Sequence, residues 1–74
     1  MTFEALAYIH RLLEAEEIRT KEAYIKARDY LEELKEGHAA KPIRKDAEET
    51  MENFDRIHMK AYHALREFEE HEWR

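Results

Sequence analysis

Several residue types that common folds and chemistries need are missing or scarce in this chain. Its 74 residues include no cysteine and no serine, and only one glycine and one proline. The absence of cysteine excludes disulfides, thiolate metal ligands and a cysteine nucleophile, and the absence of serine excludes a Ser-His-Asp triad. With so few turn-forming residues, an all-β fold is not expected.

Long hydrophobic runs and an excess of positive charge are also lacking. Charged residues such as Glu4 and Arg11 interrupt the N-terminal segment, so no signal peptide is predicted. No stretch approaches the ~20 apolar residues that span a bilayer. The 13 Lys and Arg against 18 Asp and Glu give a formal net charge of −5. This balance disfavours nucleic acid and anionic membrane as partners, and we expect a cytoplasmic protein.

The only glycine and the only proline lie close together near the middle of the chain. Gly37 suits the position just past a helix C-terminus, and Pro42 suits the first position of the next helix. Because the connection is so short, the two helices are expected to run antiparallel. The prediction is an all-α single domain over residues 1–74, with a helix over about 2–36, a loop over 37–41 and a second helix over about 42–73.

Each predicted helix has one apolar face when its residues are placed at 100° steps. A single hairpin buries only the seam between its helices and leaves part of each face in water. Pairing two hairpins about a two-fold axis would cover that surface, so we expect a homodimeric four-helix bundle. This layout resembles the Rop-like dimeric hairpins in length and helix arrangement only, which implies no function. The faces consist of Leu6, Ile9, Leu13, Ala23, Ala27, Leu31 and Leu34, and of Ile43, Ala47, Met51, Phe54, Ile57, Ala61, Leu65 and Phe68.

Two polar residues, Glu16 and Thr20, interrupt the apolar face of the first helix. The antiparallel register places them near His58, so a carboxylate, a hydroxyl and an imidazole are expected in one inner layer. Asp55 and His58 form an acid-x-x-His pair one helical turn apart. A dimer in which each chain supplied this pair and a carboxylate from Glu16 or Glu17 would match the ligands of di-iron and di-manganese bundles. The alternative interpretation is a buried polar layer that sets register without metal.

A few apolar residues lie on the opposite, outer side of the first helix. Ile18 and Ile25 are seven residues apart, and Phe3 lies near their line. A stripe of this kind indicates a docking surface for a helix of another protein or a contact in a higher oligomer; the alternative is fraying or broader burial within the bundle.

The sequence therefore favours a small interaction or regulatory module built as a dimeric helical hairpin, and a non-enzyme over an enzyme. The alternative is a four-helix-bundle protein that binds two Fe or Mn ions through the carboxylates and histidines named above. A weaker alternative is an acidic antitoxin-like or DNA-mimic inhibitor, which the net negative charge would suit.

Overall fold

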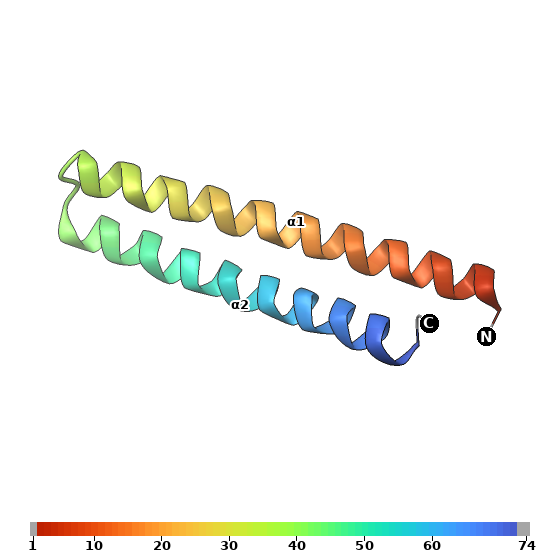
Figure 1. Ribbon diagram of the computed structural model, residues 1–74. Helices are drawn as coiled ribbons and strands as arrows, with labels where there is room; N and C mark the ends of the chain where they lie inside the picture. Colours follow the sequence, from red (N-terminus) through yellow and green to blue (C-terminus); the bar gives the residue numbers. More distant parts are fainter. Residues whose placement is uncertain (1, 73–74) are drawn as a thin grey trace.

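The computed structural model describes residues 2–72, which form two helices joined by one short turn (Figure 1). α1 spans Phe3–Glu36, and α2 spans Lys41–His71. The two helices pack against each other, and the described residues contain no strand, so the predicted all-α hairpin is confirmed. The start of α1 and the end of α2 lie at the same end of the hairpin (Figure 1). The predicted helix end at residue 73 lies outside the described residues.

α1 has residues that stabilise a helix at both of its ends. Thr2 lies in extended backbone, and its hydroxyl oxygen accepts a hydrogen bond from the Ala5 N–H at 3.2 Å. Glu4 in the first turn suits the positive end of the helix dipole, and Lys35 in the last turn suits the negative end. The cap and the two charges together favour a helix with these limits.

The turn that follows α1 is a Schellman motif. The Ala39 N–H donates to the Leu34 carbonyl at 2.9 Å, and the His38 N–H donates to the Lys35 carbonyl at 3.3 Å. His38 adopts left-handed backbone with a φ of 54°, whereas Gly37 has an ordinary φ of −81°. Gly37 thus follows the last residue of α1 as predicted, but the left-handed residue that this motif requires is the histidine after it.

The second helix begins at Lys41, one residue before the predicted start. The carbonyl of Ala40 accepts hydrogen bonds from the N–H groups of Ile43 and Arg44, both at 3.1 Å. Pro42 lies in the first two helical positions, where its missing N–H is tolerated. No side chain caps this helix, and its first turn contains no acidic residue. The start of α2 therefore lacks both features that stabilise the start of α1.

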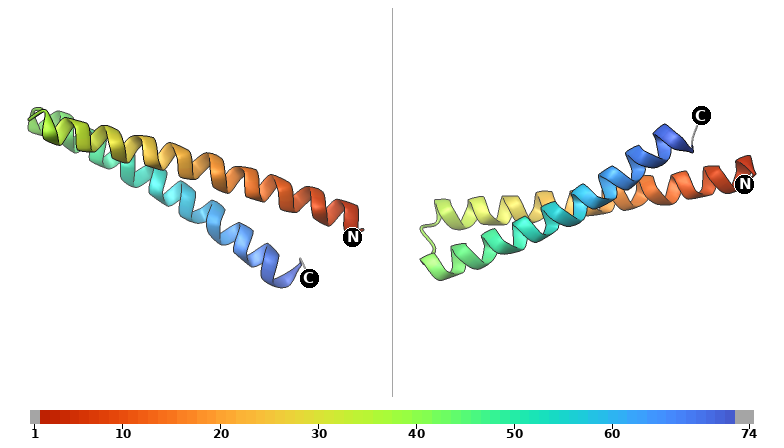
Figure 2. Two further views of the ribbon diagram at one scale, coloured as in Figure 1. Left: turned by 45° about the horizontal axis from the view of Figure 1, so that its top comes forward. Right: turned by 90° about the horizontal axis from the view of Figure 1, so that it is seen from below.

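The helices contact each other through a seam with a seven-residue repeat. Buried and half-buried residues recur at spacings of three and four, as in an antiparallel coiled coil, and the helices cross rather than lie parallel (Figure 2). The seam of α1 consists of Leu6, His10, Leu13, Glu17, Thr20, Tyr24, Ala27, Leu31 and Leu34. The seam of α2 consists of Arg44, Ala47, Met51, Phe54, His58, Ala61, Leu65 and Phe68.

The core formed by this seam is small. Among the described residues, only Thr20, Leu31 and Ala47 are buried, with 3%, 4% and 6% of their surface exposed. The hairpin is a rod of 54 × 14 × 13 Å with a Cα radius of gyration of 16.6 Å. No helix within residues 2–72 is long and apolar enough to cross a membrane.

Candidate functional site

One side of the seam is apolar and open to solvent. At about 100° per residue, Leu12 and Tyr30 of α1 point to the same side of the hairpin as Ile43 and Ile57 of α2. These four side chains form what we call the open apolar face. Their exposures are 52%, 54%, 51% and 48%, although all four border the seam. The two isoleucines are therefore only half covered by α1, although both belong to the predicted apolar face of the second helix.

Towards the chain ends, the surface of the hairpin is hollowed into a cleft of about 400 Å³. Its apolar lining comes from both helices. Charged residues of α2 border the cleft, as does Glu72, the residue directly after α2. The lining residues are Leu13, Ala64, Glu67, Phe68, His71 and Glu72.

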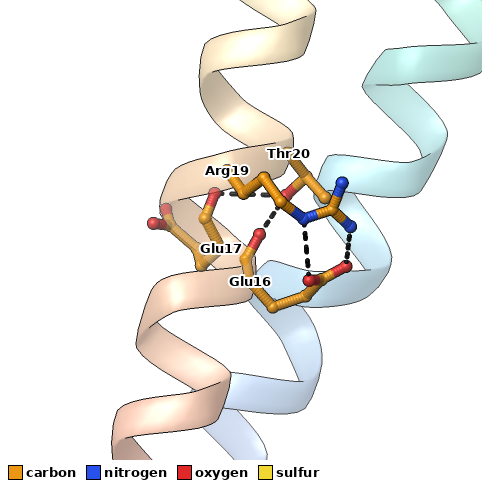
Figure 3. A network of polar contacts seen from close by, with 4 residues as sticks. All are labelled: Glu16, Glu17, Arg19 and Thr20. Carbon is orange, nitrogen blue, oxygen red and sulfur yellow. Dashed lines mark hydrogen bonds and ion pairs between the residues drawn. The ribbon is translucent and has the colours of Figure 1, made fainter.

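Glu16, which the sequence pattern placed on the inner face, is exposed and pairs within its own helix. Its carboxylate accepts two hydrogen bonds from the Arg19 guanidinium, at 2.5 and 3.1 Å (Figure 3). These hydrogen bonds hold the pKa of Glu16 below its ordinary value and raise the pKa of Arg19. Because the two charges neutralise each other, the pair adds no net charge to the side of α1 that borders the open apolar face.

Glu17 is the carboxylate that faces His58. Its side chain points to a different side of α1 from that of Glu16 (Figure 3). Glu17 Oε1 lies 3.3 Å from His58 Nε2 across the seam, and the two side chains are only 19% and 15% exposed. Asp55, the other predicted metal ligand, is exposed on α2. The structure thus brings together Glu17 and His58, and leaves Glu16 and Asp55 outside this contact.

A second histidine–glutamate pair joins the helices near the chain ends, and the sequence analysis did not predict it. His10 Nε2 lies 3.0 Å from Glu69 Oε2, and His10 Nδ1 lies 3.3 Å from Glu14 Oε1. The ring of His10 also stacks on Phe68, with 6.0 Å between the ring centroids. The hydrogen bond with His10 and the charges of His10 and Arg66 lower the pKa of Glu69.

A seven-residue repeat is the sequence signal that places His10 and Glu17 in the seam. His10 and Glu17 are seven residues apart. Tyr24 and Leu31 continue the same spacing, so these residues share one line along a coiled-coil seam. A straight 100° step drifts by ~20° per heptad from that line. Glu16 shares a second seven-residue line with Ile9 and Ala23 of the predicted apolar face, and a helical wheel therefore places it on the inner side.

Thr20 is buried in the seam, but its hydroxyl bonds within α1. Thr20 Oγ1 donates to the carbonyls of Glu16 and Glu17, at 2.8 and 3.1 Å (Figure 3). Among the described residues it makes no hydrogen bond across the seam. The predicted inner layer is therefore a Glu17–His58 contact beside a threonine that is satisfied by its own helix.

The outer stripe of α1 is exposed in part. Phe3 is 75% exposed and Ile18 is 53% exposed, whereas Ile25 is half-buried. Ile18 and Ile25 lie on the side of α1 that points away from the open apolar face, whereas Phe3, seven residues before His10, continues the seam line.

The part of the chain that the structure describes forms no metal centre by itself. Among residues 2–72, no group of three or more His, Asp or Glu side chains is placed to hold a metal ion. The Fe or Mn site suggested by the sequence would therefore need ligands from a second chain in addition to Glu17 and His58.

No family model, curated protein or solved structure matches the chain.

Proposed function

We propose that the chain is a cytoplasmic, non-enzymatic protein–protein interaction module that works as a homodimer of helical hairpins. The observation that carries this proposal is the open apolar face, whose four large side chains are about half exposed beside a small core. A single chain of this length is only marginally stable, because its hydrophobic core is small. Completing the burial of each such side chain contributes roughly 1 kcal/mol, and two chains present eight of them.

A second copy of this chain is the occupant that fits the open apolar face. Two such faces related by a two-fold axis form a four-helix bundle in which apolar residues meet apolar residues. The Glu16–Arg19 pair, which borders the face, is internally neutral. Other approaches would bring together charged surfaces of two chains that each have a net charge of −5.

The outer side of α1 would stay uncovered in this dimer and is the proposed surface for another protein. Ile18 is exposed there, Ile25 extends its line, and Phe3 is exposed near the start of the same helix. Apolar residues at a seven-residue spacing fit an amphipathic helix of the partner.

The second candidate function, a dimeric Fe or Mn protein, is favoured by the half-buried Glu17–His58 pair. In the proposed bundle, however, this pair lies on the side of the seam opposite the open apolar face. The pairs of the two chains would then lie apart and could not share two metal ions. A metal centre therefore requires a dimer joined through the other side of the hairpin.

Native mass spectrometry of the untagged chain, with and without added Fe(II) or Mn(II), tests both candidates. We expect a dimer without metal, which Ile57→Glu converts to a monomer and Ile18→Glu leaves intact. A monomeric wild-type chain, or dissociation by both substitutions, would refute the proposed interface. Two metal ions per dimer would support the second candidate instead.

The Ile18→Glu variant also tests the partner surface, because it should keep the dimer. A protein that co-purifies with the wild-type chain is expected to be absent from this variant. Its retention would contradict the assignment of the outer stripe.

A further inference from the structure

The turn end of the hairpin gathers positive charge in an otherwise acidic chain. A cleft of about 470 Å³ lies there, between the end of α1 and the start of α2. Clefts of this volume are within the range of small-molecule sites. Four cationic side chains, Lys35, Lys41, Arg44 and Lys45, line it together with the single carboxylate of Glu48, which gives a local charge of +3.

The four cations lack partners within the described part of the chain. None of them takes part in an ion pair there. The Nε of Arg44 is buried and has no hydrogen-bond partner among the described residues. A charged donor that is withdrawn from water and left unpaired is unfavourable until an acceptor reaches it. Arg44 thus brings to the cleft a guanidinium group that is paired with no acidic side chain of the described residues.

The start of α2 adds to this unbalanced positive charge. The helix has no side-chain cap and no acidic residue in its first turn. The positive end of its dipole lies beside Lys41, Arg44 and Lys45, which carry charge of the same sign. α1 shows the opposite arrangement, with Thr2 as its cap and Glu4 in its first turn. A bound anion would supply at α2 the negative charge that α1 obtains from its own residues.

We propose that this cleft binds a small molecule through a diphosphate group. One phosphate carries about −1.5 to −2 charges at pH 7 and would leave part of the local +3 charge uncompensated. Two linked phosphates match that charge better. Lysine ammonium groups bind phosphate oxygens as point charges, and Arg44 supplies directed donors. None of the lining residues belongs to the open apolar face, so this site is independent of the proposed dimer.

Titration of the full ¹⁵N-labelled chain with inorganic pyrophosphate at low salt, followed by amide NMR, tests the site. We expect saturable shifts at the amides of residues 35, 41 and 43–45, with one pyrophosphate per chain. Arg44→Gln and Lys41→Gln should each weaken binding about fivefold or more. Lys60→Gln is the matched control, because it removes the same charge from an exposed position of α2 outside the cleft. It should leave the affinity unchanged.

Inorganic phosphate is the second probe and is expected to bind more weakly than pyrophosphate. Equal affinity for the two anions would overturn the diphosphate assignment. Shifts that do not saturate, or an equal loss of affinity in Lys60→Gln, would indicate an adventitious ion only and overturn the site. Circular dichroism of each variant should show the helix content of the wild-type chain, because the substitutions lie at exposed or half-buried positions.

Discussion

His38 is the residue whose backbone is strained in the turn. Its φ of 54° lies in the left-handed region, which costs a residue with a Cβ about 1–2 kcal/mol and costs glycine far less. Replacing His38 by glycine would remove most of this cost. Part of the resulting gain in stability is offset, because glycine has more conformational freedom in the unfolded chain. We expect His38→Gly to raise the free energy of unfolding by about 1 kcal/mol. Urea denaturation followed by circular dichroism at one protein concentration measures the change.

His38→Ala is the matched control, because it removes the imidazole and keeps the Cβ. Its stability should stay within about 0.5 kcal/mol of the wild-type chain. A similar gain in both variants would attribute the effect to the lost imidazole and contradict the role of backbone strain.

Thr20 offers a test of which polar contacts hold the seam together. Its hydroxyl donates to carbonyls of its own helix, which already accept helical N–H groups in α1. Thr20→Val keeps the shape and removes only this bond, so we expect the free energy of unfolding to change by less than about 1 kcal/mol. Thermal and urea unfolding measure it. A loss above about 2 kcal/mol would show that the hydroxyl has a partner across the seam.

At this scale the sequence predicted the inner position of Thr20 and His58 and named Glu16, with Glu17 as its alternative, as the carboxylate near them. Glu16 and Glu17 differ by 100° around the helix and lie on either side of the line through Thr20. Which of them faces α2 depends on how the two helices cross (Figure 2), and a helical wheel of one helix does not contain that crossing.

Between the elements, the His10–Glu69 contact predicts a dependence of stability on pH. The hydrogen bond with His10 keeps the pKa of Glu69 below its ordinary value of 4.5. A carboxyl group with a lowered folded-state pKa stabilises the fold above its unfolded pKa, and the contribution is lost as the pH falls through the folded value. Glu69→Gln should therefore be less stable than the wild-type chain near pH 6, with a difference that shrinks towards pH ~3.

Urea unfolding of both chains at a series of pH values measures this difference. Glu67→Gln, a change of the same kind on the exposed surface of α2, should show no comparable trend. A deficit of Glu69→Gln that persists unchanged at pH ~3 would contradict the ionic origin of the contribution.

The elements themselves were predictable because their signals are local. One glycine and one proline mark the turn, and Thr2 with Glu4 marks the start of α1. The sequence predicted that part of each apolar face stays in water, but not which residues form the open apolar face. Its members depend on how α2 crosses α1. The cationic cleft was not predicted, since Lys35 lies six residues before Lys41 in the sequence and approaches it only through the reversal of the chain.

For the whole molecule, the proposed dimer should double the mass and leave the length almost unchanged. One hairpin measures 54 × 14 × 13 Å, and pairing along the open apolar face places two rods side by side. Small-angle X-ray scattering should give the maximum dimension of one hairpin with twice its mass. Ile57→Glu should keep this dimension and halve the mass. A dimension near twice that of the hairpin would indicate end-to-end association and contradict the proposed interface.

The rod shape also determines how the molecule rotates in solution. Its radius of gyration of 16.6 Å exceeds the about 11 Å of a globular domain of this length. The N–H bonds of both helices point along the long axis, so they reorient only through slow end-over-end tumbling. Nuclear spin relaxation will therefore yield a correlation time longer than the mass implies, and gel filtration will show early elution for the same reason. In both spin relaxation and gel filtration, a single hairpin would therefore look like a dimer. The number of chains has to be determined from the mass.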